Sequence, residues 1–236
     1  ALQIDGGVSV VLYDSDGQQV WERRYIDPIN QNVALADFAL DAEGNSLVTG
    51  SVYDRSTGRD CLTLKYDMTG SLVWVVRYSG IEHRDELPRK LAVDHAGNVY
   101  LVVDVSPGQT HYRDGLTLKY DAKGKLIWEK WYDSGSESAD FPYAIALDSR
   151  DDFAVVGETY RPQSGYDYLV IKYYNCPQYG DSNRDGAVDG LDIQFFIDSL
   201  IGNRPLHPSP CAFVENKSVS SEQIEIEQFV STLMNE

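Results

Sequence analysis

A repeat of about 53 residues constrains this chain more than any other feature of its sequence. Tyrosine recurs at intervals of 53, 54 and 53 residues, at Tyr13, Tyr66, Tyr120 and Tyr173. Tryptophan and aspartate keep the same spacing, at Trp21, Trp74, Trp128 and at Asp41, Asp94, Asp148. Three markers in one register indicate that the chain is built from repeated supersecondary units.

Each period contains four short runs rich in β-branched and aromatic residues. In one period these runs span 90–94, 99–104, 116–121 and 126–132. Between them lie segments with glycine or asparagine, which tolerate a positive φ and favour tight turns. Such runs predict strands, and four strands in about 50 residues predict one β-propeller blade.

The repeat resembles a bacterial β-propeller repeat family, usually credited with seven blades, whose consensus runs roughly YLTLKYDxxGxLxWxxRY…AIAVDxxGNVYVTG. Residues 62–78 followed by 90–103 match this consensus nearly position by position, and the resemblance covers about residues 8–174. Two departures are that Asp151-Asp152 replaces a Gly-Asn turn and Val102-Val103 replaces a Thr-Gly pair. The resemblance implies four-stranded antiparallel blades.

The copies do not add up to a closed ring. Residues 1–25 supply the outer two strands of one blade, and 143–174 supply three strands of another. Two whole blades span 33–78 and 87–132. Because propellers generally close with four or more blades, we expect a mainly β fold that forms a partial β-propeller, an open arc of blades.

A different chemistry begins after the repeats. Residues 175–180 resemble a linker, and residues 181–192 read DSNRDGAVDGLD. Ca²⁺ takes six to eight oxygen ligands, and this spacing offers six, from Asp181, Asn183, Asp185, the backbone carbonyl of Ala187, Asp189 and Asp192. Gly186 permits the sharp turn around the ion, and Val188 is an apolar anchor. The alternative, a polar turn without an ion, does not account for five ligands in register.

Aspartate at loop position 12, where an EF-hand has glutamate, makes the segment resemble a type I dockerin. Dockerins carry two such calcium loops, each followed by a helix. Residues 191–201 predict the first helix, because one apolar face is formed by Ile193, Phe196, Ile197 and Leu200. Gly202-Asn203 then ends it. We therefore expect a small α tail, a loop–helix pair over residues 181–236.

The second copy of this loop is incomplete. Residues 229–234 parallel residues 196–201, so a second helix is expected. The preceding loop, around 214–225, has neither aspartate nor glycine, and its remaining oxygen ligands would be Asn216, Ser218, Glu222 and Glu225. We expect one Ca²⁺ site per chain.

The three cysteines fall into two classes. Cys176 and Cys211 flank the calcium loop and its helix. In an exported protein they predict a disulfide that closes a loop of about 35 residues and stabilises the module by roughly 3–4 kcal/mol. Two free thiols are the alternative. Cys61 begins a strand and is expected to be a small buried residue.

Composition limits the partners. The formal net charge is −17, from 20 basic and 37 acidic residues, which argues against nucleic acid and anionic membranes. No run of about 18 apolar residues predicts a membrane span. The chain opens in mid-strand, so we expect a longer parent protein with an upstream export signal. The expected location is secreted or at the cell surface.

Other candidate sites have weaker support. The four histidines, His83, His95, His111 and His207, lack zinc-ligand spacing, and no catalytic motif is present. The recurring Asp41, Asp94 and Asp148 are expected to cap turns, with catalytic carboxylates as the alternative. The Trp and Tyr columns are expected to pack the core before they would stack on a sugar. No catalytic residue is predicted in this chain.

Three functional hypotheses follow. The first is a non-catalytic exported binding or scaffold protein whose dockerin-like module docks to a partner. The resemblance implies a cohesin-type partner and a setting in polysaccharide breakdown, with contacts at loop positions 10 and 11, here Gly190 and Leu191. These two lack the hydroxyl pair of cellulosomal dockerins, so another surface protein or the chain's own propeller are alternative partners, and carbohydrate is a candidate ligand.

The two other hypotheses belong to different classes. One is a fragment of a carbohydrate-active enzyme, a glycoside hydrolase or lyase, whose catalytic part lies upstream. The other is a purely structural cell-surface protein.

Overall fold

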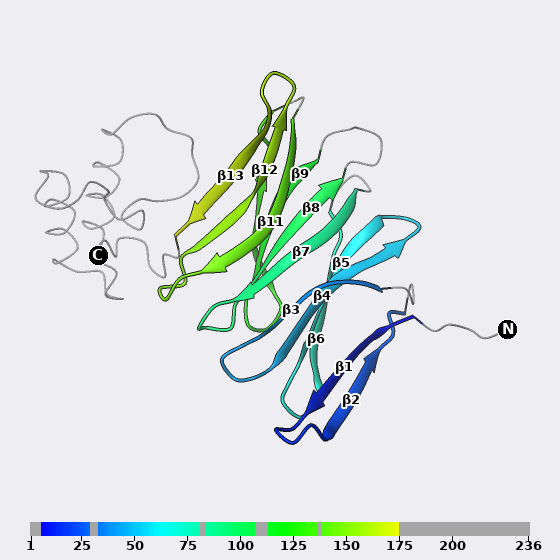
Figure 1. Cartoon of the computed structure of the whole chain (residues 1–236). Coiled ribbons are helices and arrows are strands. Elements are labelled where there is room, and N and C mark those ends of the chain that lie inside the picture. Colours follow the sequence, from blue (N-terminus) through cyan, green and yellow to red (C-terminus); the bar gives the residue numbers. More distant parts are fainter. Residues whose placement is uncertain (1–5, 29–32, 81–83, 107–112, 136–137, 175–236) are drawn as a thin grey trace, which may run out of the picture. The chain divides into compact units, whose positions relative to one another are not determined.

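The computed structural model describes residues 6–28, 33–80, 84–106, 113–135 and 138–174. The chain divides into two compact units, Ala1–Lys172 and Tyr173–Glu236. The described part is built of β-strands and turns (Figure 1). In it, no helix has the length and hydropathy needed to cross a membrane. The predicted α tail lies outside the described residues.

Four antiparallel sheets follow one another along the first unit. Sheet I pairs β1 (Val8–Tyr13) with β2 (Gln19–Tyr25). Sheet II has four strands in sequence order, β3 (Val33–Leu40), β4 (Ser46–Asp54), β5 (Gly58–Tyr66) and β6 (Leu72–Tyr78). Every connection within these sheets joins neighbouring strands.

The next two sheets repeat this meander. Sheet III contains β7 (Asp85–Val93), β8 (Val99–Ser106), β9 (Asp114–Tyr120) and β10 (Leu126–Tyr132). Sheet IV contains β11 (Ala139–Leu147), β12 (Phe153–Arg161) and β13 (Gly165–Tyr173). The prediction of a mainly β chain with four-stranded antiparallel sheets that do not close into a ring is confirmed (Figure 1).

The first strands of sheets II, III and IV lie side by side, since β3 contacts β7 and β7 contacts β11. These strands begin earlier than the sequence predicts, at Asp85 instead of Lys90 and at Ala139 instead of Tyr143. Each contains a bulge, where the register shifts around Arg89 and around Tyr143. The charged residues, the proline and the bulge conceal the strand pattern in the sequence.

The apolar core lies between successive sheets. One buried cluster joins residues of sheet II, such as Leu47 and Cys61, to Leu101 and Leu118 of sheet III. Cys61 is 1% exposed and has a free thiol, so the prediction of a small buried residue is confirmed. A second cluster joins Val8 of sheet I to sheet II.

The tryptophan column links the sheets. The indole N–H of Trp21 donates to the backbone carbonyl of Met68 at 3.0 Å, and that of Trp74 donates to Ala122 at 3.1 Å. In both cases the acceptor lies in the turn before the last strand of the next sheet. Trp128 stacks on Phe153 of sheet IV with ring centroids 6.2 Å apart. The column therefore packs between sheets, as predicted.

Candidate functional site

The predicted calcium ligands lie outside the described residues. These are Asp181, Asn183, Asp185, Ala187, Asp189 and Asp192, together with the expected contact residues Gly190 and Leu191. The cysteines of the expected disulfide, Cys176 and Cys211, lie outside them too. The metal site and the disulfide therefore stay predictions.

The recurring aspartates cap turns, as predicted. The Oδ1 atom of Asp41 accepts the backbone N–H groups of Glu43 at 3.0 Å and Asn45 at 2.8 Å. Asp94 accepts that of Asn98 at 2.7 Å, and Asp148 repeats the pattern with the residues two and four positions later. A side chain that satisfies several turn N–H groups has a structural role, and this arrangement needs no catalytic explanation.

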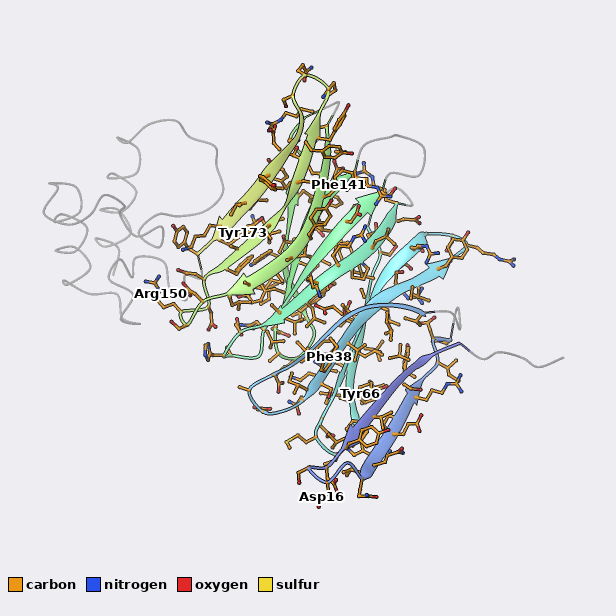
Figure 2. All side chains as sticks on the ribbon, in the orientation of Figure 1. Asp16, Phe38, Tyr66, Phe141, Arg150 and Tyr173 are labelled. Carbon is orange, nitrogen blue, oxygen red and sulfur yellow. The ribbon has the colours of Figure 1, made fainter. Side chains whose placement is uncertain are left out.

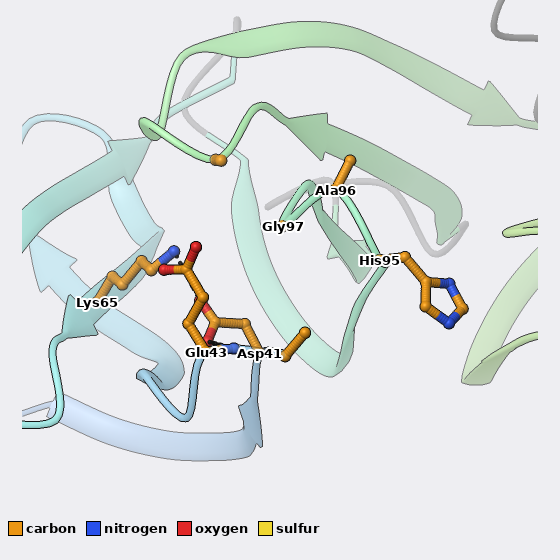
Figure 3. A pocket seen from close by; sticks show the side chains of 8 residues that line it. Asp41, Glu43, Lys65, His95, Ala96 and Gly97 are labelled. Atoms are coloured by element: carbon orange, nitrogen blue, oxygen red, sulfur yellow. Dashed lines mark hydrogen bonds and ion pairs between the residues drawn. The ribbon is translucent and has the colours of Figure 1, made fainter.

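A small pocket lies where the turns of sheets II and III meet (Figure 3). The Lys65 Nζ and Asp41 Oδ2 atoms are 2.8 Å apart in it, with side chains 7% and 3% exposed. Burial raises the pKa of Asp41, but hydrogen bonds from Lys65 and Asn45 outweigh it and hold that pKa below its usual value. The His95 side chain points away from this pair.

The size of this pocket decides its role. Its volume is about 80 Å³, against roughly 300–1,000 Å³ for pockets that enclose a small organic ligand. It has space for a few waters and none for a sugar ring. The pocket is therefore best understood as a polar junction between two sheets.

A second polar cluster lies between sheets II and III, and its carboxylates are buried. Asp60 and Glu86 are each 1% exposed. Arg77 donates to Asp60 at 3.1 Å and to Asp27 at 2.7 Å. The Asp60 Oδ1 atom and both Glu86 carboxylate oxygens have no side-chain hydrogen-bond partner among the described residues. The backbone N–H groups of Gly80 and of Glu86 itself act on the Glu86 carboxylate and oppose a rise in its pKa. Burial, followed by the charges of Asp60 and Asp85, raises the pKa of Glu86 to about 7.

An equivalent cluster lies between sheets III and IV. Carboxylate oxygens of Asp114, Asp133 and Asp140 lie within 4.8 Å of one another, which is close enough to hold a divalent cation. Each already has a protein donor, because Asp114 pairs with Arg84, Asp133 accepts a backbone N–H and Asp140 accepts from Ser134. These bonds explain the cluster without an ion.

The sequence alone predicts neither of these clusters. Glu86 and Asp140 occupy the same repeat position, one interval of 54 residues apart, and the preceding copy has Val33 there. An acidic residue at this position in two of three copies is all that the sequence offers to indicate the clusters. The acidic residue is recognised as part of a cluster only once the structure places it beside Asp60 or Asp114 of the preceding sheet.

Comparison with known proteins gives only a weak structural likeness. No protein-family profile matches the chain, and no curated protein is similar to it in sequence. Among solved structures, a mutant of an α-L-arabinofuranosidase from Fusarium graminearum, in complex with an iminosugar inhibitor, is 13% identical with a TM-score of 0.39. The match covers 70% of this chain and 54% of that chain, so this chain spans about half its length. A TM-score this low carries no argument about fold or activity.

Proposed function

We propose that the chain is a non-catalytic exported binding protein. Its antiparallel sheets act as propeller-type blades that present an interaction surface, and a dockerin-like module over residues 181–236 docks or tethers the protein. The observation that carries the proposal is the spacing of oxygen ligands in residues 181–192. Five side chains, the backbone carbonyl and the glycine of a calcium loop fall there in one register.

A calcium titration tests the metal site. We expect isothermal titration to give one Ca²⁺ per chain and none for the double variant Asp181→Ala/Asp185→Ala. Saturation at 100 times the dissociation constant adds about 2.7 kcal/mol to the free energy of unfolding of the module. Equal calcium binding by parent and variant, or two equal tight sites, would contradict the proposal.

The chain offers a matched control for this titration. Residues 14–17 read DSDG and so resemble the start and the glycine of the loop. In the structure they form a tight turn in which Asp14 accepts the backbone N–H groups of Asp16 and Gln18, at 3.0 and 2.8 Å. The double variant Asp14→Ala/Asp16→Ala is therefore expected to keep the stoichiometry of one Ca²⁺.

The docking role makes a separate claim. Since Gly190 and Leu191 occupy the positions that set partner choice in dockerins, the partner surface is expected to be apolar there. A cohesin-type or other surface protein captured in Ca²⁺ should be released by EGTA, because the metal organises the loop. A partner retained in EGTA would show that capture does not involve this module.

A further inference from the structure

Asp104 is a buried carboxylate that holds two arginines. It lies in β8 between Leu87 of β7 and Gly115 of β9, and it is 1% exposed. Its Oδ2 atom accepts from the guanidinium groups of both Arg89 and Arg113, the second at 2.6 Å. The two guanidinium groups are therefore fixed side by side by a single oxygen.

Within ion-pair distance, the charges at this place do not cancel. One carboxylate opposes two guanidinium groups, and Asp104 is the only carboxylate within ion-pair distance of either arginine among the described residues. The side chains of Arg89 and Arg113 are 41% and 35% exposed. Each guanidinium carries five N–H donors in a planar fork, so donors remain for an anion from solution. The arginine pair thus exceeds its direct counter-ion by one charge, and Glu158 is the further carboxylate near the site, where it accepts the hydroxyl of Tyr143.

The repeat does not require these charges. At the equivalent positions sheet II has Ala36, Ser51 and Arg59, and sheet IV has Tyr143, Glu158 and Tyr166. Only sheet III combines two arginines with an acid. Residues 36, 89 and 143 are the extra residues of the bulges in the first strands, and such bulges redirect a side chain out of the ladder. The fold therefore supplies the positions, and this copy fills them with cations.

Sheet IV places aromatic rings beside the arginine pair. The Arg113 guanidinium lies 5.8 Å from the ring centroid of Phe141, which Figure 2 labels on β11. Tyr143, two residues further along β11, is 47% exposed and donates its hydroxyl to Glu158. Burial and Glu158 raise the pKa of Tyr143 to about 12, and the nearby charge of Arg89 acts in the opposite direction.

We propose that Arg89 and Arg113 bind the carboxylate of an acidic sugar, a uronate residue, whose ring lies against Tyr143. A guanidinium pair matches the two oxygens of a carboxylate. The exposed tyrosine offers an apolar face with a polar edge, and Glu158 offers an acceptor for sugar hydroxyls. An acidic peptide would use the arginines and leave this aromatic surface unexplained. The inference rests on the interaction surface proposed above and gives it a ligand class.

The test is a titration of the full chain with trigalacturonate, and with neutral galactotriose and triglutamate as comparison ligands. Arg89→Lys and Arg113→Lys keep the charge that balances Asp104 and remove the planar fork. Each is expected to weaken trigalacturonate binding at least about tenfold, and Tyr143→Ser to weaken it similarly. Arg59→Lys, at the equivalent position of sheet II, is the matched control and is expected to change nothing. Added salt should weaken binding.

Three results would overturn the proposal. They are absence of trigalacturonate binding, equal binding of galactotriose, and tighter binding of triglutamate that survives Tyr143→Ser. The titration is repeated in EGTA, where uronate binding is expected to persist because none of its residues belongs to the calcium loop. The calcium titration and the trigalacturonate titration in EGTA therefore test the two proposed sites independently.

Discussion

Glu86 is a carboxyl group in a place that disfavours its charge. It is 1% exposed and its oxygens have no side-chain hydrogen-bond partner among the described residues. Burial outweighs the nearby backbone N–H groups of Gly80 and Glu86 and raises the pKa of Glu86 from 4.5 to about 7. The folded chain thus keeps this proton up to about pH 7, whereas the unfolded chain loses it near pH 4.5. Because the folded state binds more protons between these values, this group lowers the free energy of unfolding as pH rises, by about 3 kcal/mol in total.

Glu86→Gln is expected to remove this pH dependence, since the amide has a similar shape and cannot ionise. The difference in free energy of unfolding, variant minus parent, should grow between pH 4.5 and 7 and stay constant above that. Denaturant unfolding across this range measures it. A flat difference for Glu86→Gln would mean that the buried carboxyl ionises in the folded chain as it does in the unfolded chain.

Asp151 shows how a single residue can depart from the repeat. It stands where Gly44 and Gly97 stand in the other copies, and it adopts a φ of 61°. Aspartate tolerates this left-handed conformation better than most residues. Its carboxylate also contacts His95, with 3.2 Å to the backbone nitrogen and 2.7 Å to Nδ1. A contact between sheets III and IV offsets the local strain.

At the scale of the element, the capped turn is the unit that repeats, and its importance depends on burial. Asp94, which is 3% exposed, accepts the backbone and side-chain N–H groups of Asn98 and the hydroxyl of Tyr100, which is fully buried. Asp121 caps an exposed turn with only the backbone N–H groups of Lys123 and Lys125. One motif is therefore present in a buried and an exposed version.

These two versions give a matched pair of variants. Asp94→Ala leaves a buried hydroxyl without its acceptor and is expected to cost about 2–4 kcal/mol, whereas Asp121→Ala is expected to cost about 1 kcal/mol. Guanidinium unfolding followed by tryptophan fluorescence gives both values. Equal costs would show that the turn bonds, and not the buried Tyr100 hydroxyl, set the contribution.

The sequence predicts these elements well because they recur. Strands and turns appear in every copy and the tryptophan in three of the four, so a pattern that is weak in one copy becomes clear when the copies are aligned. The residues of the proposed sugar site could not be predicted from the sequence. Arg89 lies in β7, Asp104 lies in β8 and Arg113 directly precedes β9, so the three meet only through a register that includes a bulge. Because these three residues are not repeated in the other copies, a single sequence does not show that their side chains lie in contact.

At the scale of the whole first unit, a tryptophan packed on a glycine recurs at two of the three junctions between sheets, I–II and II–III. A Cβ atom on Gly124 would lie 3.0 Å from Trp74 Cδ2, and one on Gly70 would lie 2.9 Å from Trp21 Cδ2. In both cases the ring belongs to the preceding sheet. Each of these glycines thus has two roles. It adopts the positive φ that the turn requires, and its lack of a side chain lets the tryptophan of the preceding sheet pack closely against it.

Gly124→Ala against Gly17→Ala separates these two roles. Both glycines have similar positive φ values, 82° and 77°, but nothing lies within 4 Å of a Cβ on Gly17. Gly17→Ala should therefore cost only the backbone strain, roughly 1–2 kcal/mol. Gly124→Ala should cost about 1–3 kcal/mol more, because the new methyl group forces Trp74 away from sheet III. Thermal unfolding of both variants measures the difference. Equal losses would mean that the tryptophan contact does not hold neighbouring sheets together.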